Sequence, residues 1–382
     1  MSLSVVYQLI HRDRAARARA GVLHTPHGSV ETPVFMPVGT QAVVKTVDPD
    51  LVARTGARIV LANTYHLLLQ PGPAVVRRCG GLHGFMGWSG PILTDSGGVQ
   101  VFSLPGRVIE EEGVRFPLEK GGGKTLVLTP EDSIRTQNDL GADIIMAFDE
   151  CIPFPAGHGY AAASVERTLR WAERCLEAHR RPEDQALFGI VQGSVYPDLR
   201  ERCARALVAM DFPGYAVGGV SVGEGHELMK RAVEMSEPFL PEGKPRYLMG
   251  VGKPEDVLEA VDRGMDMFDC IIPAKFGRGG TLFTWTGKMR IRRPQYRKDR
   301  YPVDTSCGCP TCRRFSRAYL HHLFEVDEPL GKALATVHNL SFYAELMARA
   351  RRAILEDRFR AFKSEFYAGY FDRRRRPGDG EA

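Results

Sequence analysis

Three aspartates stand at positions in this sequence where folding alone does not explain a carboxylate. Asp269 lies inside the apolar run "GMDMFDCIIP", while Asp95 and Asp149 end the apolar runs "PILTD" and "ADIIMAFD". An ionised carboxylate is costly in an apolar setting unless it is paired or used in chemistry. Asp95 and Asp149 could each instead cap a helix, but "MFDCIIP" offers no turn before Pro273. Asp269 is therefore the hardest of the three to explain as a structural residue.

Two carboxylates flanking a glycosidic bond form a known catalytic arrangement. One attacks the anomeric carbon, the other transfers protons, and a close pair retains configuration through a covalent intermediate. A poorly solvated Asp269 suits the nucleophile, and Asp95 lies in "LTDSGGVQ", where glycines let the backbone approach a ligand. The residues alone do not decide which carboxylate has which role.

A second group of residues has the composition of a metal site. "CGCPTC" supplies Cys307, Cys309 and Cys312, and His338 follows 26 residues after the last of them. Three thiolates and one imidazole complete a tetrahedral zinc site with no position left for water, so the predicted Zn²⁺ is structural, one per chain. His321 and His322 are rival fourth ligands, less favoured because a helix is expected from about Arg314. Chance clustering of cysteines is the alternative to a metal site.

Repeated strand and helix patterns must position these groups. Helical patterns separate several of the apolar runs, and such alternation predicts parallel strands, which in eight units close into a (β/α)8 TIM-type barrel. The eight runs are "TPVFMPVG", "ARIVLANTYH", "PILTDSGG", "ADIIMAFDE", "LFGIVQG", "GYAVGGV", "RYLMGVG" and "DMFDCIIP". The expected helices are "EDSIRTQNDLG", "SVERTLRWAERCLEAHRR", "PDLRERCARALVAM", "HELMKRAVEMSEPF" and "PEDVLEAVDRG".

The ends of these runs indicate where the site lies. In such a barrel the active site gathers at the carboxyl ends of the strands. Helix capping would explain any one polar end residue, but a shared site explains them together. The residues are Asn63, Asp95, Asp149, Gln192, Gly219, Gly250 and Asp269.

Composition and charge divide the chain further. We expect a catalytic barrel over 1–285, followed over 286–382 by a zinc-binding subdomain and C-terminal helices packed on the barrel. The net charge of +5 is concentrated in two places, the segment 289–302 with six Arg or Lys, and Arg373 to Arg376. Such clusters attract phosphates when they are not simply solvated surface. No apolar run approaches the ~20 residues of a membrane helix, and the N-terminus does not read as a secretory signal, so we expect no membrane association and a cytoplasmic location.

Taken in order, the motifs resemble one enzyme family. "LTDSGGVQVFSL", "MAFDECIPFP", "FGIVQG", "YAVGGVSVGE", "YLMGVGKPED", "GMDMFDCIIP" and "CGCPTC" with its later histidine are similar to bacterial tRNA-guanine transglycosylases, the queuine tRNA-ribosyltransferase family. The resemblance implies exchange of guanine at the anticodon wobble position for 7-aminomethyl-7-deazaguanine (preQ1), a step in queuosine biosynthesis. It also implies a covalent ribosyl-aspartate intermediate, tRNA substrates of the Asp, Asn, His and Tyr types, no redox cofactor or ATP, and a homodimer.

The resemblance implies a role for individual residues. Asp269 corresponds to the nucleophile and Asp95 to the general acid/base. Asp149 and Gln192 correspond to residues that read the purine edge. The remaining implied contacts are Gly219 and Val220 as backbone partners of the base, Glu224 as support for that peptide, Met249 as a wall of the slot, Ser96, Asn63, His66 and Gln100 near the reacting nucleotide, Lys275 and Arg278 at the tRNA, and Cys307, Cys309, Cys312 and His338 at zinc.

Four positions depart from or qualify the family pattern. Val99 stands where bacterial members usually carry an aromatic residue that stacks on the base, which predicts a looser slot. Lys275 and Gly279 fall in "PAKFGRGG" where the family usually has arginine and asparagine, and lysine lacks the arginine fork. Val222 is bulky and is expected to exclude full queuine.

Two other functions fit part of the pattern. A carbohydrate hydrolase would need aromatic sugar platforms at the mouth, and Trp88, Trp171 and Trp285 do not obviously supply them. A catalytically silent RNA-binding subunit would be favoured by loss of Asp95 or Asp269, and both are present.

Overall fold

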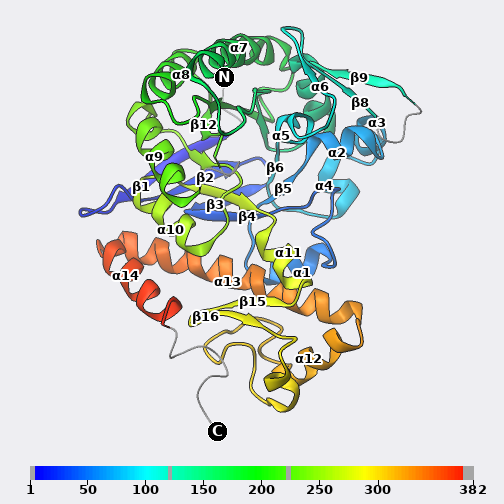
Figure 1. Ribbon diagram of the computed structural model, residues 1–382, viewed down its shortest axis with the longest axis vertical. Coiled ribbons are helices and arrows are strands. Elements are labelled where there is room, and N and C mark those ends of the chain that lie inside the picture. Colours follow the sequence, from blue (N-terminus) through cyan, green and yellow to red (C-terminus); the bar gives the residue numbers. More distant parts are fainter. Residues whose placement is uncertain (1–4, 119–122, 221–224, 373–382) are drawn as a thin grey trace.

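Eight parallel strands form one sheet that curls into a nearly closed barrel (Figure 1). The computed structural model describes residues 5–118, 123–220 and 225–372. A parallel bridge between Val38 and Leu61 and a hydrogen bond from Gly39 N–H to the Leu61 carbonyl at 2.6 Å join the two outer strands. All eight apolar runs are strands, so the predicted (β/α)8 fold is confirmed. Around the barrel the strands follow the order β4 (Val34–Pro37), β14 (Met267–Cys270), β13 (Arg246–Leu248), β12 (Gly214–Val217), β11 (Ala186–Val191), β10 (Ile144–Met146), β6 (Ile92–Thr94) and β5 (Val60–Ala62).

Helices cover the outside of the barrel, and all five predicted ones are present. Their ends follow the sequence: Thr129 and Asp132 form a capping box at the start of α6, and Gly141 ends it with a φ of 74°. The helices of this part are α1 (Pro49–Arg54), α2 (Thr64–Leu69), α3 (Pro73–Arg78), α4 (Gly81–Met86), α5 (Gly98–Phe102), α6 (Pro130–Leu140), α7 (His158–Ala178), α8 (Pro197–Ala209), α9 (His226–Ser236), the 3-10 helix η1 (Glu237–Phe239) and α10 (Pro254–Asp262).

Two small antiparallel sheets complete the barrel. The sheet of β1 (Val6–Arg12), β2 (Arg19–Thr25) and β3 (Gly28–Thr32) packs its buried residues against the apolar interior of the strands. A buried ion pair fixes it, since Arg19 Nη2 lies 2.8 Å from Asp266 Oδ2 just before β14. The other sheet contains β7 (Val108–Ile109), β8 (Val114–Pro117) and β9 (Thr125–Leu128).

The C-terminal region has its own apolar cluster and one long helix that reaches the barrel. In Figure 1, α13 runs between the barrel and the β15–β16 hairpin. Asn339 on α13 donates to the carbonyls of Pro273 and Thr281, both at 3.0 Å. The elements are α11 (Ile272–Arg278), β15 (Thr281–Thr284), β16 (Gly287–Arg290), η2 (Pro294–Lys298), α12 (Arg317–Glu325), α13 (Pro329–Leu355) and α14 (Phe359–Tyr370).

Two helix boundaries differ from expectation. The helix expected near Arg314 begins at Arg317, because the Ser316 side chain caps it. The helical tail is broken between α13 and α14, where Asp357 has a φ of 55°. Among the described residues, none of the helices is both long and apolar enough to cross a bilayer.

Candidate active site and metal centre

Asp95 follows β6 and is held by donors on both carboxylate oxygens. Asn63 Nδ2 and Gln100 Nε2 donate to Oδ2 at 2.6 and 3.0 Å, and Thr64 N–H donates to Oδ1 at 2.7 Å. Burial raises the pKa of Asp95 above its ordinary value, although these hydrogen bonds oppose the rise. A buried carboxyl group with a raised pKa is suited to carrying a proton.

Asp269 lies on β14, three strands from Asp95 around the barrel. Its Oδ1 accepts hydrogen bonds from Tyr247 OH at 2.6 Å and from Gly250 N–H at 2.8 Å. Burial, reinforced by the negative charge of Asp95, raises the pKa of Asp269, and the two donors oppose this rise. Asp95 is thus close enough for its charge to act on Asp269. That the two carboxyl groups form a catalytic pair stays a prediction.

Asp149 and Gln192 meet beside this pair. Gln192 Nε2 donates to Asp149 Oδ2 at 2.6 Å, and Ser96 Oγ lies 3.4 Å from Asp149 Oδ1. Burial, with a contribution from the charge of Glu150, raises the pKa of Asp149 to about 6. Gln192 Oε1 is buried and accepts no hydrogen bond from the described protein atoms. An acceptor left in this state is available to a donor on a ligand.

The backbone after β12 closes on the Gln192 side chain. A Cβ built on Gly219 would lie 2.4 Å from Gln192 Oε1, and its φ is +65°, so only glycine suits this position. Val220 is buried, and Met249 is partly buried against the barrel interior. Glu224 and Val222, predicted at this wall, lie outside the described residues.

The other predicted residues lie further out. Val99, at the start of α5, is 51% exposed. His66 is half-buried on α2, and its ring contacts the ring of Tyr65 edge-on with centroids 5.4 Å apart. On α11, Lys275 is exposed and Arg278 is half-buried, which lowers the pKa of Arg278.

The basic segment 289–302 presents its cations to solvent but not both of its tyrosines. Tyr296 is buried in the core of the C-terminal region, whereas Tyr301 is 61% exposed. Only Tyr301 is thus available to a ligand. The exposed cations are Arg290, Arg292, Arg293, Arg297, Lys298 and Arg300. Arg373 to Arg376 lie outside the described residues.

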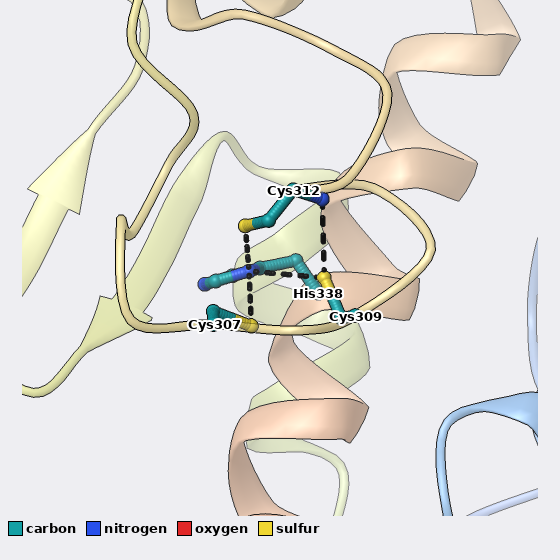
Figure 2. A group of neighbouring side chains, drawn as sticks. All are labelled: Cys307, Cys309, Cys312 and His338. Atoms are coloured by element: carbon teal, nitrogen blue, oxygen red, sulfur yellow. Dashed lines mark hydrogen bonds between the residues drawn. The ribbon is translucent and has the colours of Figure 1, made fainter.

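The predicted metal ligands form one cluster, drawn in Figure 2. His338 Nδ1 lies 3.8, 3.6 and 3.3 Å from the sulfurs of Cys307, Cys309 and Cys312. Tetrahedral zinc with its usual bond lengths would hold nitrogen and sulfur about 3.5 Å apart. His338 Nε2 donates to the Phe283 carbonyl at 2.7 Å, which turns the Nδ1 lone pair toward the sulfurs. These four residues fit a tetrahedral metal ion.

Neither rival histidine belongs to this cluster. His321 Nδ1 is 2.8 Å from the Ile291 carbonyl, and His322 is exposed on α12. The choice of His338 over both as fourth member of the group is thus confirmed.

A second cluster of possible ligands lies at the opposite end of the barrel. His27 Nδ1 is 2.8 Å from Asp143 Oδ1, and His83 Nε2 is 3.3 Å from Asp143 Oδ2. The two imidazole rings stack with centroids 3.5 Å apart and an interplanar angle of 14°. In-plane lone pairs of nearly parallel rings do not converge on one ion, so we interpret this group as a hydrogen-bonded latch between the β2–β3 turn, α4 and β10.

Sequence reasoning missed two donors to the catalytic pair. Thr64 donates its N–H to the Asp95 carboxylate and its hydroxyl to the Asp95 backbone carbonyl, and Tyr247 donates its hydroxyl to the Asp269 carboxylate. In "RYLMGVG" Tyr247 looks like an ordinary strand residue. The signal lies in the register, because Tyr247 pairs with Met267 and Asp269 is two residues further along the same face.

The fold and site define a (β/α)8-barrel enzyme whose metal-binding part stands apart from its mouth. Comparison with known proteins gives the family. A family model described as "Queuine tRNA-ribosyltransferase" matches residues 13–372. The chain is 55% identical over 368 residues to the queuine tRNA-ribosyltransferase of Macrococcus caseolyticus (strain JCSC5402), and 54% identical over 368 residues to that of Staphylococcus aureus (strain JH9). Both alignments cover 96% of this chain and 97% of the relative.

The chain therefore belongs to the queuine tRNA-ribosyltransferase family. This membership confirms the predicted class of tRNA-guanine transglycosylase, an enzyme that modifies guanine in tRNA in the synthesis of queuosine.

Proposed function

We propose that the protein replaces guanine at the wobble position of tRNA with preQ1 through a covalent bond between Asp269 and the ribose. The observation that carries the proposal is the pair Asp95 and Asp269, two buried carboxyl groups at one barrel mouth whose charges interact.

In the first half of the reaction, Asp269 acts as the nucleophile. Its carboxylate attacks C1′ of the ribose as the bond from C1′ to guanine breaks, and the electron pair leaves with the base. Tyr247 OH and Gly250 N–H stabilise the ionised form of Asp269 before attack. Asp95, whose pKa is raised by burial, gives its proton to the departing guanine.

In the second half, the incoming base reverses these steps. The ring nitrogen of preQ1 transfers its proton to Asp95 and attacks C1′, and the ester bond to Asp269 breaks. Asp95 is then protonated and Asp269 ionised, as they were at the start. No other reactant is needed, because one base replaces another on the same sugar.

The neighbouring polar groups are suited to reading a purine edge. Asp149 as a carboxylate accepts from ring and amino N–H groups, and the free Gln192 Oε1 offers one more acceptor. The Gly219–Val220 backbone and Met249 bound the slot, and the family resemblance assigns the support of that peptide to Glu224, which lies outside the described residues. Ser96, Asn63, His66 and Gln100 surround the reacting nucleotide. A buried polar slot of this kind discriminates strongly, because a wrong base leaves groups unpaired.

The rest of the molecule binds tRNA and keeps its shape. Lys275, Arg278 and the exposed cations of 289–302 hold backbone phosphates of a tRNA of the Asp, Asn, His or Tyr type. Cys307, Cys309, Cys312 and His338 hold one structural Zn²⁺, which stabilises the fold and takes no part in the chemistry.

We propose a homodimer that works in the cytoplasm, with 1–285 as catalytic barrel and 286–382 as zinc-binding and helical part.

Sugar hydrolysis is less well supported, because the three tryptophans are engaged elsewhere. Trp88 donates to the Pro91 carbonyl, Trp171 stacks on Phe148 in the core, and Trp285 lies under Arg349. The silent RNA-binding subunit is also disfavoured, since both Asp95 and Asp269 are present with their donors.

Incorporation of radiolabelled guanine into unmodified tRNA tests the mechanism. The wild type is expected to incorporate guanine and to form a tRNA adduct that survives denaturing electrophoresis. Asp269→Ala should abolish both signals, and Asp95→Asn should strongly slow exchange. Undiminished incorporation by Asp269→Ala would remove Asp269 from the proposed role. Unlabelled preQ1 added as a competitor should reduce the incorporation of labelled guanine, which tests the identity of the incoming base.

A further inference from the structure

The first turn of α8 contains a fully buried arginine whose side chain turns back toward the base slot. Arg200 is 0% exposed. A buried guanidinium is tolerated only when hydrogen bonds replace its water. Nε donates to the Ser194 carbonyl at 2.8 Å, and Nη1 donates to the carbonyls of Val191 at 3.1 Å and Gly218 at 2.9 Å.

These carbonyls belong to the ends of two neighbouring strands. Val191 is the last residue of β11, and Gly218 follows the last residue of β12. The Val191 carbonyl also accepts from Gly218 N–H at 3.0 Å, so Arg200 extends a contact that already joins the two strands. Arg200 thus bonds to the backbone on either side of Gln192 and immediately before Gly219.

The backbone segment that Arg200 contacts has no side chains of its own to fix its conformation. Gly218 and Gly219 are consecutive glycines, and glycine is the residue with the greatest backbone freedom in the unbound chain. On the slot side they pack against Gln192, whose Nε2 would lie 2.8 Å from a Cβ built on Gly218. A Cβ built on Gly219 would lie near Gln192 Oε1 at 2.4 Å and also near Arg200 Nη2 at 3.6 Å. The Gln192 amide and the Arg200 guanidinium therefore both lie close to this pair of glycines.

We propose that Arg200 is a positioning residue that fixes the Gly218 carbonyl and thereby keeps the Gly219–Val220 backbone in register with the Gln192 amide. The inference rests on the proposed function, because it assigns Arg200 to the slot that reads the base. It predicts a specific effect: loss of the arginine fork weakens binding of the base, because part of the binding free energy must then order the glycines. Attack on the ribose and binding of tRNA use other residues and are unaffected.

Arg200→Lys is the main test, because lysine keeps the charge but cannot reach three carbonyls from a planar fork. Arg200→Gln serves as a second variant should the lysine variant fail to fold. Arg202→Lys is the matched control: Arg202 lies on the same helix, is exposed, and pairs with Glu166 at 2.9 Å. The KM for guanine should rise about tenfold in Arg200→Lys, with kcat and the KM for tRNA within about twofold of wild type. The control should match the wild type.

Two further measurements separate positioning from general stability. Hydrogen–deuterium exchange over 214–220 should be faster in Arg200→Lys than in Arg202→Lys, while exchange over 144–146 should be the same. The inference would be overturned if the KM for guanine in Arg200→Lys stayed at the wild-type value, whether or not kcat fell.

Asp149→Asn and Gln192→Ala reveal whether a failure lies in the inference or in the slot itself. If these variants raise the KM for guanine and Arg200→Lys does not, the role of Arg200 is wrong and the slot stands. If they also leave the KM for guanine unchanged, the proposed base slot is wrong, and the role of Arg200 falls with it.

Discussion

The two carboxyl groups that we propose to be catalytic show how local donors affect ionisation in a buried setting. Burial raises the pKa of both Asp95 and Asp269. Asp269 accepts hydrogen bonds from a phenol and a backbone amide, and the phenol belongs to a fully buried side chain, Tyr247. At the scale of single residues, Tyr247 is therefore one of two donors that oppose the rise that burial causes in the pKa of Asp269.

Tyr247→Phe should shift the acid limb of the kcat profile to higher pH. Loss of a donor to the carboxylate favours the protonated form, so the pKa of Asp269 rises and less nucleophile is ionised at a given pH. We expect kcat near neutral pH to fall about tenfold. A pH–rate profile of guanine exchange measures both effects, and an acid limb that stays in place would show that Tyr247 does not tune Asp269.

Asp149 should make base binding depend on pH. Its pKa of about 6 means that the acceptor carboxylate is lost as the pH falls through this value. Between about pH 7 and pH 5, the KM for guanine should therefore rise about tenfold. Glu150→Gln removes a neighbouring negative charge, lowers the pKa of Asp149 and moves the rise to lower pH. A KM that is flat over this range would contradict a carboxylate acceptor at Asp149.

At the scale of elements, the ends of the strands were easier to predict than the contacts between them. Apolar runs separated by helical patterns identify the eight strands of the barrel sheet, and several of these runs end on a polar residue or a glycine that we expect at the mouth. The position of Tyr247 beside Asp269 depends instead on the register of β13 against β14, which no local pattern specifies. Arg200 was missed for the same reason, because its carbonyl partners lie on two other elements.

The latch at the foot of the barrel should contribute to stability in a pH-dependent way. Burial opposes ionisation of Asp143, but hydrogen bonds from His83, His27 and Ile92 N–H outweigh it and hold its pKa below the ordinary value. A depressed pKa adds stability above the unfolded-state pKa, and this stability is lost as the pH falls through the folded-state pKa.

Asp143→Asn should therefore lower the free energy of unfolding by about 1–3 kcal/mol at neutral pH. The difference from wild type should shrink below about pH 4. Urea denaturation at several pH values measures it. Asp139→Asn is the control, because Asp139 makes an exposed pair with Arg77 and should change stability little. An equal effect of the two substitutions would mean that the latch adds nothing.

At the scale of the whole molecule, the barrel and the metal-binding part are joined through α13. The spacing of Cys307, Cys309, Cys312 and His338 was sufficient to predict the cluster, since thiolate and imidazole at these intervals have few other uses. The packing of α13 on the barrel was not predicted in detail, because a helix that is apolar on several faces does not indicate which face meets which partner.

His338→Ala should reduce bound zinc from about one ion per chain to a small fraction and lower the melting temperature. The three sulfurs then lose the ligand that completes the tetrahedron. His322→Ala, on the exposed face of α12, should retain the metal. Metal analysis after gel filtration, with thermal denaturation of both variants, measures the outcome. Retention of zinc by His338→Ala would require a different fourth ligand.

Two consecutive residues of α13 contact different parts of the molecule. His338 faces the cysteine sulfurs, while Asn339 donates to the carbonyl of Pro273, four positions beyond Asp269. Any rotation of this helical turn that follows demetallation must pull on the backbone leading away from Asp269. If the cluster holds the proposed Zn²⁺, a chain without it is thus expected to have a misaligned Asp269 as well as a loosened fold, which would tie the proposed catalysis to completed maturation.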